Sequence, residues 1–109
     1  MCSILGIFDI DPSADRADLR ARAIALSARQ RHRGPDWSGV YDDGRVLLVH
    51  ERLAIVGLVS GAQPLRSADG GLALAVNGEI YNHRELRRRL AARYAFQSDS
   101  DCEVINALY

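Results

Sequence analysis

The sequence has little cysteine, no net charge and no long apolar run. Two cysteines in 109 residues, without a Cys-x-x-Cys pair or a Cys/His zinc spacing, exclude a disulfide scaffold and predict no metal site. The 14 Lys and Arg balance the 14 Asp and Glu, so no overall field favours nucleic acid or an acidic membrane surface. No segment approaches the ~20 consecutive apolar residues of a membrane helix. At 48% hydrophobic and 26% charged residues, the chain is typical of one globular domain or part of one.

The two ends of the chain carry expectations about its context. The first residues do not form a secretory signal, because a basic start is missing and Asp9 and Asp11 interrupt the apolar run. A cytoplasmic location is the default expectation. At the other end, the sequence stops at Tyr109 within a predicted helix that has no stop signal. We therefore expect residues 1–109 to be a fragment or a truncated domain.

Hydrophobic periodicity and turn residues predict an α+β chain in the order β-α-β-β-β-α-β-α. The expected strands cover 3–8, two segments within 37–56 joined at Asp43-Gly44, 72–78 and 95–97. The expected helices cover 13–33, 83–94 and 102–109, and a polar loop covers 57–71.

Two patterns predict capping boxes at helix starts. Asn82 is followed three residues later by Glu85, and Ser100 by Glu103. In a capping box the two side chains bind each other's backbone N–H groups.

The residue behind the initiator methionine is Cys2. Met1 is removable when the second residue is small, and its loss would leave a free α-amino group beside the Cys2 thiol. With ordinary pKa values of ~7.7–8.0 for the amine and ~8.5 for the thiol, the amine can take the thiol proton near neutral pH. Cys2 is therefore a candidate nucleophile with its own base. The alternative, from this stretch alone, is a small buried apolar side chain.

A second alternative pairs Cys2 with a histidine as the base. His32 lies between two arginines at an expected helix end, and His83 lies at a helix start; each position has an ordinary structural role available. His50, on an expected strand, is the strongest of the three candidates. Cys102, near the start of the last helix, is interpreted as a core residue.

Three further stretches place polar groups beside buried segments. Arg52 within "HERLAIV" indicates a carboxylate partner, either an internal acid or a ligand. Asn77 and Gly78 within "AVNGEIYN" offer two donors to an oxyanion, or form a plain Asn-Gly turn. The acids of "DSDCE" suit a helix N-terminus or a ligand ammonium. Together with Cys2, these groups suit an α-amino acid with a side-chain amide, such as glutamine.

At these residues the sequence resembles the glutaminase domain of class II glutamine amidotransferases, which are N-terminal-nucleophile hydrolases. Within that group it is most similar to the N-terminal domain of glutamine-hydrolysing asparagine synthetases. The matching stretches occur in order and cover nearly the whole chain: "MCSILGIFD", "RHRGPDWSG", "HERLAIV", "GAQPL", "LAVNGEIYNH" and "SDCEV". The resemblance implies an αββα sandwich, of which this chain is the N-terminal part.

The resemblance also implies a role for each matching residue. Cys2 would attack the glutamine amide with its α-amino group as base, and Asn77 and Gly78 would form the oxyanion hole. Arg52 would bind the substrate α-carboxylate, and Arg33 would have an interface role. The other implied glutamine-binding residues are the backbone of Leu53, Ala54, Ile55 and Val56, and the acids Glu79 and Asp101 for the α-ammonium.

The partners implied by the resemblance lie largely outside this chain. L-glutamine is the expected substrate, and the ammonia would pass to a C-terminal synthetase domain of the same polypeptide, which would need ATP and Mg²⁺ to make asparagine from aspartate. No cofactor is expected in residues 1–109, and the full-length protein could form a homodimer. Two alternatives stay open: the same chemistry with another ammonia acceptor, or an inactive truncated domain with an assembly role. One departure from the family pattern is Asp99, which replaces a small residue beside the ammonium subsite.

Overall fold

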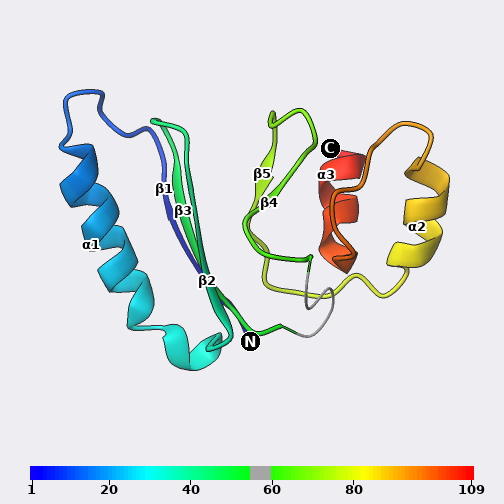
Figure 1. The fold of residues 1–109 in the computed structure, drawn as a ribbon, viewed down its shortest axis with the longest axis horizontal. Coiled ribbons are helices and arrows are strands. Elements are labelled where there is room, and N and C mark those ends of the chain that lie inside the picture. Colours follow the sequence, from blue (N-terminus) through cyan, green and yellow to red (C-terminus); the bar gives the residue numbers. More distant parts are fainter. Residues whose placement is uncertain (55–59) are drawn as a thin grey trace.

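The computed structural model describes residues 1–54 and 60–109, and its first half is a three-stranded antiparallel sheet with one helix on it (Figure 1). The strands are β1 (Ser3–Ile7), β2 (Trp37–Asp42) and β3 (Leu47–Arg52), in the order β1-β3-β2. Helix α1 (Arg16–Ala28) packs on one face, mainly against β3. The buried core between them consists of Ile10, Ala23, Leu47 and Val49.

Helix α1 ends earlier than its sequence pattern predicts. Its start is capped by Asp15, whose carboxylate accepts the Asp18 N–H at 3.0 Å. After Ala28 the chain tightens into a short 3₁₀ turn, η1 (Arg31–Arg33), and leaves at Gly34. A Cβ on Gly34 would lie 2.2 Å from the backbone oxygen of Glu51, so glycine is required for this loop to pack on β3.

The second half of the chain has two short strands and two short helices. Strands β4 (Leu65–Arg66) and β5 (Ala73–Leu74) form a hairpin. Helix α2 (His83–Leu90) packs beside the 3₁₀ turn η2 (Asp101–Glu103) and helix α3 (Val104–Leu108). No helix in the described part of the chain is long and apolar enough to cross a bilayer.

One predicted strand is shorter than expected and a second is wrong, because side chains bind their backbone groups. The segment predicted as 72–78 is a strand only at Ala73–Leu74, since the Val76 N–H binds the Gln63 side chain and the Val76 carbonyl binds His50. The segment 95–97 is not a strand. There the Gln97 N–H donates to the carboxylate of Glu103 instead of to a neighbouring strand.

The two predicted capping boxes are also wrong. Asn82 stands at the start of α2 but its side chain makes no cap hydrogen bond. The Ser100 side chain makes none either, and the Glu103 carboxylate accepts from Ser98.

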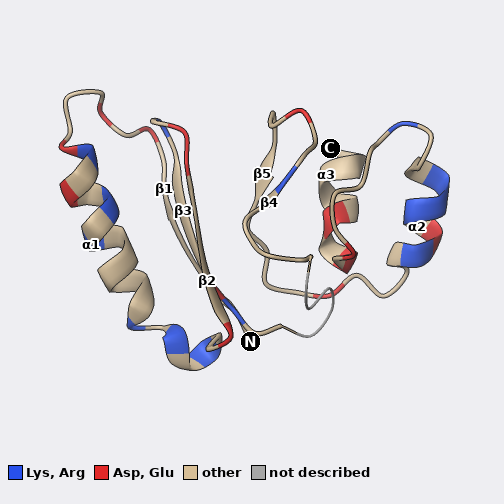
Figure 2. Ribbon diagram, in the orientation of Figure 1, with Lys and Arg blue, Asp and Glu red and all other residues tan. Residues whose placement is uncertain are grey.

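Charged residues of one sign gather locally, as the balanced composition predicts. Figure 2 shows basic residues along α2, and the acidic residues of η2 lie beside helix α3.

Candidate functional site

A pocket of about 420 Å³ opens where the N-terminus meets the end of β3, the segment after β5 and the turn η2. Seven of the candidate site residues line it: Cys2, Arg52, Leu53, Asn77, Gly78, Glu79 and Asp101. Cys102, which the sequence predicts as a core residue, lines it as well. Ala54 is described but is not among the lining residues, and Ile55 and Val56 lie outside the described residues. Four segments far apart in the sequence therefore converge on one cavity.

Cys2 is held at the start of β1, so the sheet sets its position. Its Sγ accepts the Leu53 N–H at 3.3 Å and lies 3.6 Å from the Leu53 carbonyl oxygen. The side chain is half-buried, whereas Met1 is 70% exposed. The terminal methionine is thus accessible for removal while the thiol already faces the pocket.

The turn η1 contacts Cys2, and the loop that follows η1 holds the end of β3. The Arg33 guanidinium donates through Nε to the Cys2 carbonyl at 3.5 Å. Asp36 donates its N–H to the Arg52 carbonyl at 3.0 Å, and its carboxylate accepts the Ala54 N–H at 2.8 Å. The sequence pattern indicates a helix stop here but not the role of Asp36, whose partners are 16 and 18 residues away. The proximity of Arg33 to the thiol-bearing residue is likewise not predicted.

Neighbouring charges on β3 face different environments. Arg52 is buried and lines the pocket. Glu51, also buried, accepts hydrogen bonds from Ser27, Arg31 and Ser38 on the side of α1. Burial by itself would raise the pKa of Glu51, but these hydrogen bonds together lower it. Glu51 is therefore a buried anion tied to α1, η1 and β2.

The Asn77–Glu79 segment is exposed on the pocket wall. A Cβ placed on Gly78 would meet no atom within 4 Å. Asp101, by contrast, is 6% exposed, and its carboxylate accepts the Ile80 N–H at 2.6 Å. An amide side chain, a glycine and two carboxylates thus line the same cavity as Cys2.

The arrangement does not pair Cys2 with a histidine. His50 is fully buried, and its Nε2 donates to the Val76 carbonyl at 3.0 Å. Since a carbonyl only accepts, Nε2 carries the proton. His32 lies exposed in η1 and His83 is half-buried at the start of α2. None of the three is among the described residues that line the pocket.

Acid is expected to destabilise the protein through His50. Burial, aided by the nearby Arg52 charge, lowers the pKa of His50 below its ordinary 6.5. Below about pH 6.5 the unfolded chain therefore binds a proton on His50 that the folded chain does not. The free energy of unfolding keeps its full contribution from His50 above about pH 6.5 and loses it as the pH falls. Urea unfolding at about pH 7.5 and 5.5 measures this loss. Between these pH values the free energy of unfolding should fall more for the unaltered protein than for His50→Gln, by up to about 1.4 kcal/mol per pH unit. Equal pH slopes would contradict this assignment.

Asp99, the departure from the family pattern, does not line the pocket. Its carboxylate accepts the Ser60 O–H at 3.1 Å, and its N–H donates to the Ser60 hydroxyl oxygen at 3.0 Å. The extra acid therefore binds Ser60 and is not among the residues that line the pocket. Among the described residues, no group of three or more His, Cys, Asp and Glu side chains could hold a metal ion.

This chain belongs to the glutamine amidotransferase domain family, whose model matches residues 1–109. It is 56% identical over its whole length to asparagine synthetase B [glutamine-hydrolyzing] of Escherichia coli (strain K12), covering 19% of that protein. It is 53% identical over 111 residues to a probable asparagine synthetase of Dictyostelium discoideum, covering 20%, and 50% identical to asparagine synthetase 1 of Arabidopsis thaliana, covering 18%. The resemblance predicted from the motifs is confirmed, and the chain spans about one fifth of these relatives.

Proposed function

We propose that this chain forms the part of a glutaminase domain that carries the nucleophile and the glutamine pocket. The domain would hydrolyse L-glutamine to glutamate and ammonia. The observation that carries the proposal is the convergence of Cys2 with Arg52, Asn77, Gly78 and Asp101 around one cavity. Together these groups match the side-chain amide, the α-carboxylate and the α-ammonium of glutamine, and family membership supports the same substrate.

The reaction begins at the thiol of Cys2. After loss of Met1, the free α-amino group of Cys2 takes the thiol proton, and Sγ attacks the side-chain amide carbon. Charge then develops on the amide oxygen, which the Asn77 side-chain NH₂ and the Gly78 N–H stabilise. The α-ammonium group of Cys2 then gives its proton to the amide nitrogen of the substrate, the C–N bond breaks and ammonia leaves. Water then hydrolyses the glutamyl thioester and regenerates the thiol.

Recognition uses the charges at the other end of the substrate. The buried Arg52 would pair with the α-carboxylate, since a guanidinium can donate to both carboxylate oxygens. Glu79 and Asp101 would hold the α-ammonium, and the backbone of 53–56 would close the pocket, with Ile55 and Val56 outside the described residues. Arg33 would contribute through the Cys2 carbonyl that it contacts and at an interface with the synthetase portion.

The fate of the ammonia lies beyond the pocket. We propose that it passes to a C-terminal, ATP- and Mg²⁺-dependent synthetase domain of the same polypeptide that makes asparagine from aspartate, because the relatives carry that name. The complete domain would be an αββα sandwich, and the full-length protein would be cytoplasmic and able to form a homodimer. Production of asparagine from aspartate, ATP and glutamine would distinguish this acceptor from others and from an inactive assembly domain.

The role of Arg52 is tested by the substrate carboxylate that it is proposed to bind. In a protein containing the complete domain, Arg52→Ala should raise the KM for glutamine by about 10- to 100-fold, since hydrogen bonds to charged groups contribute about 1.5–3 kcal/mol, and should change kcat much less. Arg22→Ala, on the exposed face of α1, is the matched control and should change neither parameter.

A second substrate makes this test specific. Glutaminamide carries a neutral amide in place of the α-carboxylate, so it should be a poor substrate for the unaltered protein. Arg52→Ala should lower kcat/KM for glutaminamide little further. If Arg52→Ala weakens glutamine and glutaminamide equally, with the fold confirmed by its unfolding midpoint, Arg52 does not bind the α-carboxylate.

A further inference from the structure

The loop that carries the oxyanion donors is held by two consecutive residues of η2. Asp101 accepts the Ile80 N–H on one carboxylate oxygen at 2.6 Å. The Cys102 thiol donates to the Gly78 carbonyl at 3.3 Å. These contacts lie on either side of Glu79. Since a Cβ on Gly78 would meet no atom within 4 Å, side-chain packing does not hold this residue, and the contact to its carbonyl limits rotation of the peptide between Gly78 and Glu79.

Both holding groups are buried and chemically suited to their bonds. Asp101 is 6% exposed and Cys102 is 2% exposed, so neither contact competes freely with water. Burial, followed by the charge of Asp101, raises the pKa of Cys102 to about 12. The thiol therefore keeps its proton at neutral pH and remains a donor. The Asp101 bond is charge-assisted and is the stronger of the two.

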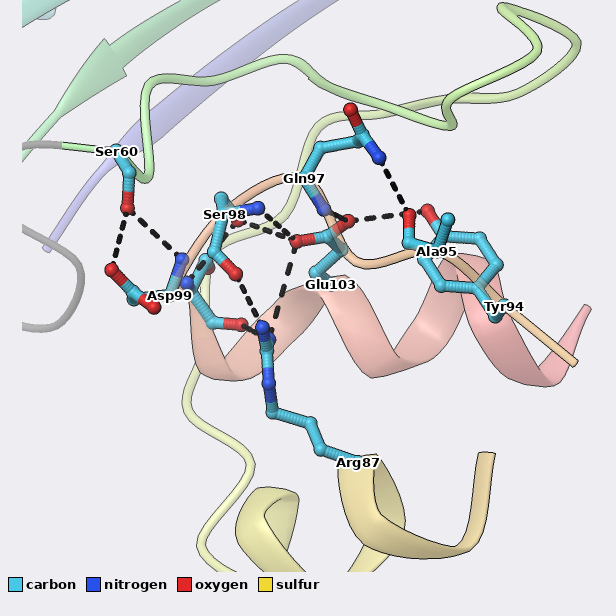
Figure 3. A network of polar contacts seen from close by, with 9 residues as sticks. Ser60, Arg87, Tyr94, Ala95, Gln97, Ser98, Asp99 and Glu103 are labelled. Carbon is cyan, nitrogen blue, oxygen red and sulfur yellow. Dashed lines mark hydrogen bonds and ion pairs between the residues drawn. The ribbon is translucent and has the colours of Figure 1, made fainter. Parts of the chain in front are cut away.

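A polar network centred on Glu103 holds η2 itself in place (Figure 3). The buried Glu103 carboxylate accepts from the Gln97 N–H at 2.6 Å and from the Ser98 N–H at 2.8 Å. Arg87 of α2 donates to the Ser100 carbonyl at 3.0 Å, directly before Asp101. The turn that supports the donor loop is thus tied to α2 and to the segment before it.

We infer that Asp101 and Cys102 are positioning residues for the Asn77–Gly78 donor pair, so that Asp101 serves two subsites of the pocket. This inference rests on the proposed function, because it assigns those donors to the oxyanion. One carboxylate then both faces the substrate ammonium and fixes the loop that stabilises the transition state. Cys102 lines the same pocket, and its thiol supports the same loop through the Gly78 carbonyl.

Paired substitutions at Asp101 separate its two roles. Asp101→Asn keeps an oxygen that can accept the Ile80 N–H but removes the charge, so it should raise the KM for glutamine and largely preserve kcat. Asp101→Ala removes both, and should also lower kcat by about 10- to 100-fold, the scale expected when catalytic donors are displaced. Equal kcat values for Asp101→Asn and Asp101→Ala would overturn the positioning role.

Paired substitutions at Cys102 test the thiol. Cys102→Ala should lower kcat by about 2- to 10-fold, the scale of one hydrogen bond, with little change in KM. Cys102→Ser retains an O–H donor and should lose less activity. A Cys102→Ala protein with unaltered kcat, or a Cys102→Ser protein no better than Cys102→Ala, would overturn the role of Cys102.

Two controls keep these results distinct from failure of the fold or of the proposed function. Each kcat is divided by the amount of Cys2 that reacts with a small uncharged alkylating agent, so misfolded protein is not counted. Asn82→Ala, near the same loop, should retain unaltered kinetics. If the unaltered protein does not hydrolyse glutamine, the proposed function fails. If it does, and Asn77→Ala lowers kcat while the Asp101 and Cys102 pairs show no difference, only the positioning inference fails.

Discussion

A residue placed ahead of Cys2 is expected to reduce glutamine hydrolysis to background. The α-amino group would then be part of a peptide bond, which cannot take the thiol proton. The pocket offers no histidine as a replacement among its described lining residues, since His32, His50 and His83 do not line it, and its carboxylates Glu79 and Asp101 are assigned to the substrate ammonium. Extra residues at this point would also extend from the edge of the cavity that Met1 lines.

The cleanest version of this experiment uses one protein in two forms. A leader that a specific protease removes directly before Cys2 is fused to a protein with the complete domain, and glutamate release is measured before and after cleavage. Activity should appear only after cleavage, in proportion to the mass-spectrometric yield of N-terminal Cys2. Equal activity in the uncleaved and cleaved forms would rule out the α-amino group as base and would favour the alternative in which a histidine is the base.

Replacement of Asn77 by alanine is expected to lower kcat by about 10²–10³-fold with little change in the KM for glutamine. The reason is that the Asn77 NH₂ is proposed to bind a charge that exists only after Cys2 attacks. Asn77 is exposed on the pocket wall, so its loss should leave the unfolding midpoint nearly unchanged. The matched control is Asn82→Ala, because Asn82 is an exposed amide nearby whose side chain makes no cap hydrogen bond. A large rise in KM with unaltered kcat would assign Asn77 to substrate binding instead.

Local patterns are sufficient for much of the fold. Strands β1, β2 and β3 and helix α2 follow from apolar periodicity and from turn residues such as Asp43-Gly44, because these signals lie within a few neighbouring positions. The segments 75–78 and 95–97 could not be predicted in the same way. Their backbone groups bind side chains of His50, Gln63 and Glu103, and a strand-like pattern does not reveal such competition.

Some residues of the candidate site can be recognised in the sequence, and others cannot. Cys2, Arg52 and the Asn77–Gly78 pair stand out in the sequence because their chemistry is unusual for their position, and the family motifs reinforce them. Asp36 and Cys102 could not be recognised, since the first looks like a turn residue and the second like a core residue. Their relevance depends on backbone partners at Ala54 and Gly78, which only the folded chain brings to them.

Cys2, freed of Met1, is proposed to be the nucleophile that attacks glutamine. The most direct measurement treats the active protein with a glutamine analogue that carries a diazoketone in place of the amide, and locates the covalent label by peptide mass spectrometry. One label is expected on an N-terminal Cys2, with excess glutamine preventing it and activity lost in proportion to labelling. A label on Cys102, or a fully active protein that retains Met1, would show that an N-terminal Cys2 is not the nucleophile.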